Sequence, residues 1–166
     1  MPIAAIIPTK PCPAILWIAV LKVPPKVMPL QKIPRSRARE IALQVLFEDD
    51  LNPGRNVEES DQFLRNRLHL PEALEYAQLL VEGVRRNRTE LDVILARTAD
   101  NWSLGRMAVT DRNLLRLGAF EILYTDTPER VAINEAVEIA KRYGAKQSAQ
   151  FVNGVLDKLL AGHEKK

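Results

Sequence analysis

Three arginines at alternate positions form the first chemically distinctive group of the sequence. Arg35, Arg37 and Arg39 open the stretch RSRAREIALQVLFEDDL, and Lys32 stands just before them. The apolar spacing of this stretch predicts a helix, and cations in the first turn of a helix cost up to about 1 kcal/mol. Alternate positions on a helix face different directions, so one neighbouring acid such as Glu40 cannot pair with all three. Guanidinium groups bind phosphate bidentately, and the pattern therefore predicts contact with an RNA backbone.

A second basic cluster, RRNR at residues 85–88, serves as an internal comparison. Arg85 and Arg86 fall at the predicted end of a helix, where the dipole favours cations and the last carbonyls accept their hydrogen bonds. We interpret this cluster as a solvated helix end that needs no ligand. The arginines that begin at Arg35 have no such help, although an exposed helix start without a ligand stays open as the alternative for them.

The residues that usually carry catalysis or metal binding are scarce and scattered. Cys12 is the only cysteine, which excludes an intrachain disulfide and a zinc site built on several cysteines. The two histidines, His69 and His163, are far apart, and there is no glycine-rich phosphate loop and no nucleophile-elbow pattern. We therefore expect no catalytic residue and no metal ligand, and we do not expect an enzyme.

The net charge of +3 is unevenly distributed along the chain. Residues 1–27 contain Lys10, Lys22 and Lys26 and no acid. The other 21 basic residues, which are the 24 of the whole chain less these three, are balanced by 21 acidic residues. A net-neutral domain has no global field that attracts nucleic acid, so any such affinity must come from local clusters.

Residues 1–33 differ in composition from the rest of the chain. Eight of the eleven prolines fall within residues 1–34, which forbids a long helix there. The apolar run Ala14–Leu21 has eight residues, whereas a membrane span needs about twenty. We interpret residues 1–33 as a disordered leader, with Met28 as the working start of translation, and residues 34–166 as one helical domain.

From Ser36 onward, apolar residues follow the helical period, and no segment with a period of two occurs. This pattern predicts an all-α fold of about seven helices joined by short loops. The predicted helices are a first from about Arg37 to Glu48 with Ser36 as N-cap, a short second around Phe63 to Leu68, a third beginning at Pro71, a fourth capped by Asn87 or Thr89, a fifth capped by Thr110, a sixth from Thr127 and Pro128 to Gly144, and a seventh beginning at Ser148.

Four residues inside the predicted helices interrupt the expected pattern. Gly118 and Gly154 each cost about 1 kcal/mol relative to alanine. The usual reason for such a glycine is close approach of a second helix, and we expect that at both positions rather than a ligand role. Asn134 and Glu135 are polar residues in an apolar-striped helix, and we interpret them as structural hydrogen-bonding groups in preference to readers of RNA.

Several separated stretches resemble the NusB family of bacterial transcription antitermination factors. RSRAREIALQVLF, from residue 35, is similar to the arginine-rich start and first helix of that family. DRNLLRLGAFEIL (residues 111–123) is similar to its fifth helix, and VAINEAVEIAKRYGAKQSAQFVNGVLDKL (residues 131–159) is similar to its C-terminal signature. The resemblance covers about residues 35–160.

This resemblance implies two small three-helix bundles without catalysis or a cofactor. It also implies binding to the boxA element of nascent ribosomal transcripts together with NusE, a ribosomal protein of the small subunit. The pair would join an RNA polymerase elongation complex that suppresses premature termination, in the bacterial cytoplasm. The alternative is a helical protein-interaction module or homodimer whose arginines meet acidic residues, without direct readout of RNA.

Carried over position by position, the arginine motif of the family falls on Arg35, Arg37 and Arg39. Ser36 departs from that motif, in which an arginine is common, and the lost phosphate contact should flatten the salt dependence of binding by about one unit of slope. An acidic residue that contacts NusE in the family falls on Asp111, which by itself is only a favourable acid in a first helical turn.

The second RNA-facing region that the resemblance implies is the start of the last helix, which falls on Lys146, Gln147, Gln150 and Phe151. The chemistry fits, because free amides at a helix start bind phosphate and an aromatic ring can stack on a base. Phe151 also fits the apolar stripe of its own helix, so core packing and RNA stacking both stay open for it.

Overall fold

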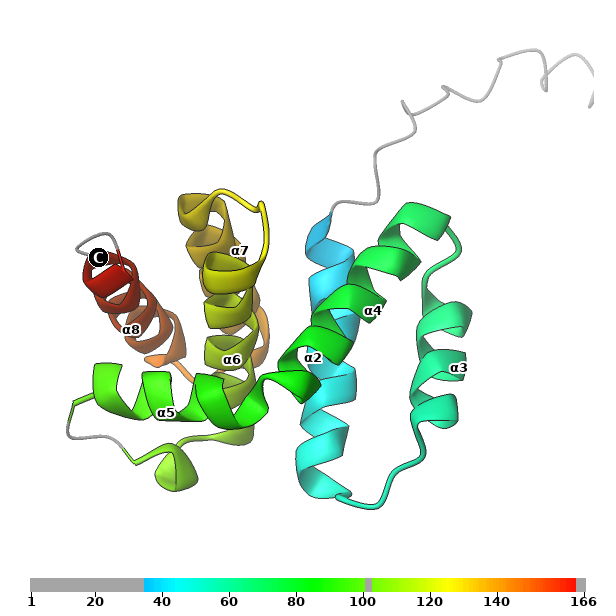
Figure 1. The fold of residues 1–166 in the computed structure, drawn as a ribbon, viewed down its shortest axis with the longest axis horizontal. Helices are drawn as coiled ribbons and strands as arrows, with labels where there is room; N and C mark the ends of the chain where they lie inside the picture. Colours follow the sequence, from blue (N-terminus) through cyan, green and yellow to red (C-terminus); the bar gives the residue numbers. More distant parts are fainter. Residues whose placement is uncertain (1–34, 101–102, 164–166) are drawn as a thin grey trace, which may run out of the picture. The chain divides into compact units, whose positions relative to one another are not determined.

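The computed structural model describes residues 35–100 and 103–163, and α-helices form most of this part of the chain (Figure 1). No strand occurs among the described residues, and the predicted all-α class with seven α-helices is confirmed. The bounds are α2 Arg35–Leu51, α3 Val57–Arg67, α4 Pro71–Arg86, α5 Arg88–Thr98, α6 Val109–Tyr124, α7 Glu129–Tyr143 and α8 Ser148–His163, with one 3-10 turn, η1, at Leu104–Arg106. The predicted leader, residues 1–33, lies outside the described residues.

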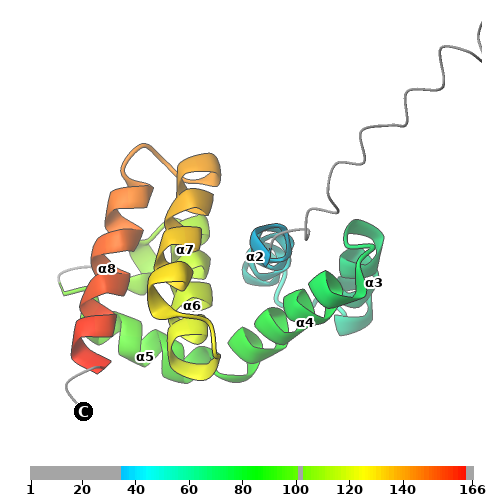
Figure 2. The ribbon, with the colours of Figure 1, turned by 90° about the horizontal axis from the view of Figure 1, so that it is seen from above.

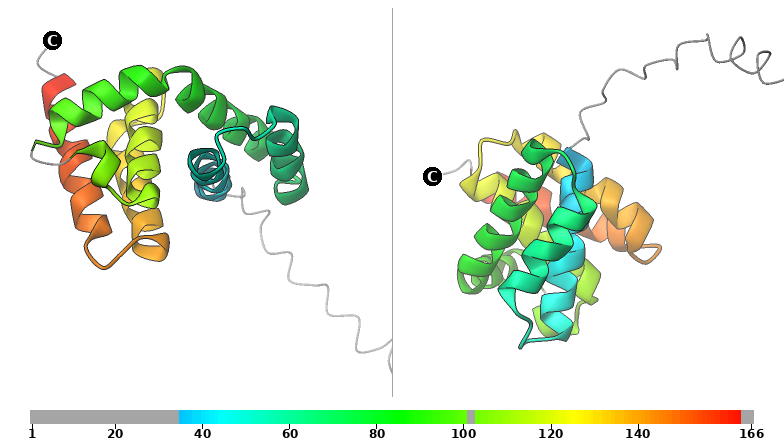
Figure 3. Two further views of the ribbon diagram at one scale, coloured as in Figure 1. Left: turned by 90° about the horizontal axis from the view of Figure 1, so that it is seen from below. Right: turned by 90° about the vertical axis from the view of Figure 1, so that its right-hand side faces the viewer.

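The described helices group into two small bundles. α2, α3 and α4 pack on one another, while α6, α7 and α8 form the second group, which α5 contacts through α6 and α8. Figure 2 shows α6, α7 and α8 side by side, and Figure 3 shows α5 continuing from the end of α4 across one end of that group. α2 also packs against α6. The arginine-rich first helix therefore lies beside the central helix of the second bundle.

Buried apolar faces hold these helices together. Leu80 of α4, Leu114 and Leu117 of α6 and Leu156 of α8 are fully buried, as the helical spacing of the apolar residues requires. None of the described helices combines the length and the apolar character that crossing a bilayer requires.

Three predicted helix ends are confirmed. Pro71 is the first residue of α4, and Ser148 is the first residue of α8. α7 ends at Tyr143, and Gly144 is its C-cap. A Cβ atom at Gly144 would lie 2.5 Å from the Cβ of Ser148 and 2.7 Å from the carbonyl oxygen of Ala140. The turn from α7 into α8 is therefore tight enough to need a glycine.

Two predicted caps are corrected by the structure, and a third is confirmed in position only. Ser36 lies inside α2, because the helix already includes Arg35. Thr110 lies inside α6, which begins at Val109 after Ala108. Asn87 is the N-cap residue of α5, as one of the two predicted candidates, but its side-chain amide donates to the carbonyl oxygen of Gly83 at 2.8 Å and makes no capping hydrogen bond to α5. A hydroxyl or amide residue near a helix start is a weak marker of its exact boundary.

The helical glycines differ in what surrounds them. A Cβ atom at Gly118 would lie 2.6 Å from the Leu156 side chain, so α6 and α8 approach closely there, as predicted. At Gly154 nothing lies within 4 Å of such an atom, and the same prediction is wrong because this residue is exposed. Gly83, which the sequence does not distinguish, would place a Cβ atom 2.0 Å from the Phe120 ring. Small residues thus let α6 pack tightly against α4 and α8.

Candidate nucleic-acid interface

Arg39 is buried instead of facing solvent, with an exposed fraction of 2%. Its Nε donates to Glu121 Oε2 at 2.9 Å and its Nη2 donates to Glu121 Oε1 at 2.7 Å. Glu121 belongs to α6 and is completely buried. This corrects the expectation that all three arginines of α2 are free for phosphate, because an acid 82 positions away in the sequence already neutralises Arg39.

Tyr76 completes this buried ionic site. Arg39 Nη2 donates to the Tyr76 hydroxyl at 3.0 Å, and that hydroxyl donates to Glu121. Burial lowers the pKa of Arg39, but hydrogen bonding and the charge of Glu121 outweigh this, and the pKa is raised above its ordinary value. Burial and the charge of Glu121 raise the pKa of Tyr76 to about 12. These contacts join α2, α4 and α6.

The polar residues of α7 divide into two kinds. Glu135 Oε2 lies 3.5 Å from Arg39 Nη1, so it has the structural role that the sequence predicted. Asn134 is exposed and its side chain makes no hydrogen bond among the described residues, so the structural interpretation does not hold for it.

Arg37 and Arg142 share a single carboxylate. Arg37 Nη1 donates to Glu40 Oε2 at 2.9 Å, and Arg142 of α7 donates to the other oxygen of the same group. The two arginine side chains are 42% and 52% exposed, whereas that of Glu40 is 6% exposed. One negative charge cannot neutralise two positive charges, so this part of the surface keeps a net positive charge.

Arg142 is a residue that sequence reasoning missed. It stands 102 positions from Glu40 and looks like an ordinary cation in the last turn of a helix. Only the packing of α7 brings it to the arginines of α2.

Arg35 has no carboxylate within ion-pair distance among the described residues, and its side chain is exposed. Its guanidinium carbon lies 4.8 Å from the centroid of the Tyr76 ring, which holds the side chain at the start of α2. Arg35 and Ser36 line a groove of about 780 Å³ beside α4 and the start of α7. Lys32, the fourth predicted cation, lies outside the described residues.

A second groove, of about 450 Å³, brings together the other predicted residues. The residues that line it come from the starts of α6 and α8 and from η1, and include Asp111, Gln147, Gln150, Phe151 and Arg106. We call it the α6–α8 groove. Lys146 is exposed in the turn that leads into α8. The predicted residues at the start of the last helix are thus neighbours of Asp111, which the sequence placed apart from them.

Core packing of Phe151, one of the two roles that the sequence left open, is confirmed, and its stacking on RNA stays a prediction. It is half-buried, packs against the hydrophobic core and also lines the α6–α8 groove. Arg106 of η1 is exposed at the same groove and was not predicted, because its position depends on how the loop between α5 and α6 folds.

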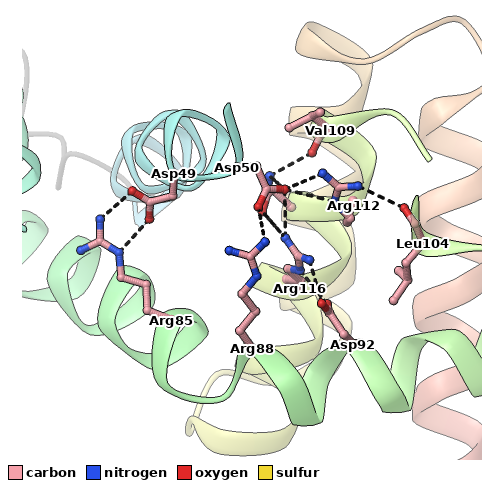
Figure 4. A network of polar contacts seen from close by, with 10 residues as sticks. Asp49, Asp50, Arg85, Arg88, Asp92, Leu104, Val109, Arg112 and Arg116 are labelled. Carbon is pink, nitrogen blue, oxygen red and sulfur yellow. Dashed lines mark hydrogen bonds and ion pairs between the residues drawn. The ribbon is translucent and has the colours of Figure 1, made fainter. Parts of the chain in front are cut away.

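The second arginine cluster has a different environment (Figure 4). Arg85 donates to Asp49 at 2.7 and 2.8 Å, so it is held by α2 and is not a purely solvated helix end. Arg88 donates to Asp50 at 2.6 Å. Arg86 is exposed, as the sequence interpretation expected for this helix end.

Asp50 is the centre of a network that joins α2, α5 and α6. Its carboxylate accepts hydrogen bonds from Arg88, from Arg112 at 2.8 Å and from Arg116 at 3.0 Å. Arg116 also donates to Asp92 at 2.7 Å. Burial raises the pKa of Asp50, but hydrogen bonding and the charges of these arginines outweigh it and lower the pKa below its ordinary value. These arginines are engaged within the protein.

The described residues form a small all-helical domain in which Arg37 and Arg142 share the carboxylate of Glu40 and Phe151 lines the α6–α8 groove. The chain is a member of the NusB family, whose family model matches residues 36–161. It is 43% identical over 141 residues to the transcription antitermination protein NusB of Desulfitobacterium hafniense, covering 80% of this chain and 91% of that protein. It is also 43% identical over 129 residues to the protein of the same name from Anaeromyxobacter dehalogenans, covering 77% and 91% of the two chains.

Solved structures agree with this assignment. NusB of T. maritima superposes with a TM-score of 0.70 at 37% identity, covering 77% of this chain and 91% of that one. A crystal structure of the antitermination factors NusB and NusE in complex with double-stranded RNA matches with a TM-score of 0.69 at 30% identity, covering 77% and 96%.

Proposed function

We propose that this protein is a transcription antitermination factor that binds boxA-type RNA of ribosomal transcripts together with NusE, as part of an elongation complex in the cytoplasm. Family membership and the related NusB–NusE–RNA structure support this function. The observation in this chain that carries it is the sharing of Glu40 by Arg37 and Arg142, which leaves positive charge on the surface.

In this proposal the start of α2 binds phosphate and the start of α8 contacts bases. Arg35 and Arg37 supply exposed guanidiniums, with Lys32 before them and Lys146 at the turn into α8. Single-stranded RNA suits such a surface because its unpaired bases are free to stack and to form hydrogen bonds.

Arg39 has a different part in this proposal. It holds α2 against α6 through Glu121 and so positions the exposed arginines instead of touching RNA. Gln147, Gln150 and Phe151 then supply amide and aromatic contacts from the α6–α8 groove.

The partner contact predicted for Asp111 stays a prediction. The support for NusE as partner is the related complex, in which NusB and NusE occur together with RNA. Co-purification of this protein with its cognate NusE, with and without boxA RNA, tests that part. Sedimentation tests the alternative of a homodimer, which RNA should dissociate if the two use one surface.

The RNA-binding surface is tested by Arg37→Glu in a filter-binding titration with boxA RNA. Charge reversal removes a phosphate contact and adds repulsion, so we expect the dissociation constant to rise by at least about tenfold at moderate salt. Arg86→Glu is the matched control, because Arg86 is an exposed arginine of the other cluster. Equal affinities of Arg37→Glu and the native protein, with both shown to be folded, would remove α2 from the RNA-binding surface.

A further inference from the structure

We propose that Tyr76 is a positioning residue for RNA binding, whose ring holds the guanidinium of Arg35 at the start of α2 and leaves its charge and its N–H groups for a phosphate. The inference rests on the proposed function, because it assumes that the start of α2 binds the RNA backbone. Tyr76 is only 9% exposed and belongs to the hydrophobic core, so it acts through Arg35 instead of touching RNA.

Arg35 differs from the other arginines of its stretch in how it is held. Arg37 and Arg39 both donate to carboxylates, which take up part or all of their charge. The guanidinium carbon of Arg35 lies 4.8 Å from the centroid of the Tyr76 ring, and Arg35 forms no ion pair among the described residues. An aromatic face attracts a cation without neutralising it, and the N–H groups of a guanidinium lie in the plane of that group. The ring therefore holds Arg35 while its donors stay available to a phosphate.

The Tyr76 ring is itself fixed through its hydroxyl. This hydroxyl accepts a hydrogen bond from Arg39 Nη2 at 3.0 Å and donates one to Glu121. It also lies 3.3 Å from Oγ1 of Thr127, which is buried in the turn between α6 and α7. Rotation of the ring away from Arg35 would break these contacts, and a buried polar group without a partner is costly. The ring is therefore a rigid support for the guanidinium.

An arginine that is already held binds phosphate better than a free one. A free arginine side chain populates many rotamers and loses this freedom when it binds. Contacts that select the bound position before binding reduce that cost. The attraction of an exposed cation to an aromatic ring corresponds to about two- to fivefold in an equilibrium constant. We expect the contribution of Tyr76 to RNA affinity to be of this order.

The experiment measures the binding of boxA RNA to the full chain in its native form and in the variants Tyr76→Leu, Arg35→Ala and the double variant. Tyr76→Leu should raise the dissociation constant about two- to fivefold. The double variant should bind no more weakly than Arg35→Ala, because the ring then has no guanidinium to hold. The slope of log affinity against log salt should fall by about one unit in Arg35→Ala and stay unchanged in Tyr76→Leu, which keeps every charge.

Two controls separate this role from a general loss of structure. Tyr76→Phe loses the hydroxyl contacts but keeps the ring, so it should be less stable in urea and still bind RNA as the native protein does. Tyr124→Leu is the matched control, because the Tyr124 ring stacks on Phe120 and holds no guanidinium in the part of the chain that the structure describes. It should leave RNA affinity unchanged.

NMR spectra of the native protein test the contact itself, whether or not Tyr76→Leu folds. The ring current of Tyr76 should shift the side-chain proton signals of Arg35 upfield relative to those of Arg86, an exposed arginine. Unshifted signals, native affinity in Tyr76→Leu, or an equal loss of affinity in Tyr76→Phe and Tyr76→Leu would each overturn the inference. So would a Tyr76→Leu effect that persists in the absence of Arg35. All these results leave the proposed function intact, whereas a native protein that binds no boxA RNA overturns both.

Discussion

The arginines of residues 35–39 and those of residues 85–88 are similar in composition but differ in how they share their carboxylate partners. In the second cluster, Arg85 has Asp49 to itself, while Arg88 shares Asp50 with Arg112 and Arg116 inside the protein. In the first cluster, Arg39 is paired internally, Arg37 and Arg142 share Glu40, and Arg35 rests on an aromatic ring.

The comparison teaches that a count of basic residues does not measure the charge available for a ligand. The available charge depends on how many guanidiniums share each acid and on whether they can reach solvent. At Asp50, Arg112 and Arg116 are mostly buried and hold helices together, and only Arg88 is about half exposed, whereas at Glu40 both arginines are about half exposed.

Substitution of Arg39 by Met should have the largest effect on the free energy of unfolding. It leaves Glu121 buried without its cation, and breaking one partner of a buried ion pair costs about 3–5 kcal/mol. Urea unfolding measures this loss. The double variant with Glu121→Leu should recover much of the stability. A loss below about 1 kcal/mol for Arg39→Met would show that the pair is not a structural centre.

Substitution of Asp50 by Asn should have the next largest effect on the free energy of unfolding, a loss of about 3 kcal/mol at neutral pH, because three arginines lose their common acid. The loss is smaller than for Arg39 because one of these arginines, Arg88, is half exposed. The pKa of Asp50 is lowered in the folded protein. Its stabilisation is therefore complete above the unfolded-state pKa of about 3.9 and is lost as the pH falls through the lower folded-state value. The free energy of unfolding, measured from neutral pH down to about pH 2, should depend less on pH for Asp50→Asn than for the native protein. The same pH dependence of the free energy of unfolding in both proteins would contradict the stabilising role of the Asp50 carboxylate.

Substitution of Arg142 by Ala should have the smallest effect on stability, within about 0.5 kcal/mol, because the side chain is half exposed. RNA binding should weaken several-fold, and the slope of log affinity against log salt should decrease by about one unit. Arg65→Ala on the exposed surface of α3 is the control and should change neither quantity. The same slope of log affinity against log salt in both variants would show that Arg142 is not part of the RNA surface. It would also indicate that Glu40 fully neutralises Arg37.

Local features of the fold were predictable where a single residue dictates backbone geometry. Pro71 begins α4 and Gly144 ends α7, because the proline ring and the absence of a Cβ atom act within one turn of the chain. The caps assigned to Ser36 and Thr110 were wrong, because hydroxyl residues are also tolerated inside a first turn. The close approach expected at Gly154 failed because no second helix lies against that face.

The candidate site was predictable in composition but not in arrangement. Arg35 and Lys146 are exposed and Arg37 is partly exposed, so their positions are compatible with the expected RNA surface. Three features depend on contacts between helices that are distant in the sequence. Arg39 is buried, Arg142 pairs with Glu40, and Asp111 lines the same groove as Phe151.

The sequence by itself determined the helices and the family, because helical period, helix-ending residues and motifs are properties of neighbouring residues. Only the tertiary structure decided which arginines are left for a ligand. Glu121 lies 82 positions from Arg39, and Glu40 lies 102 positions from Arg142. A charge is neutralised by whichever acid the packed helices bring to it, and that acid can come from any part of the chain.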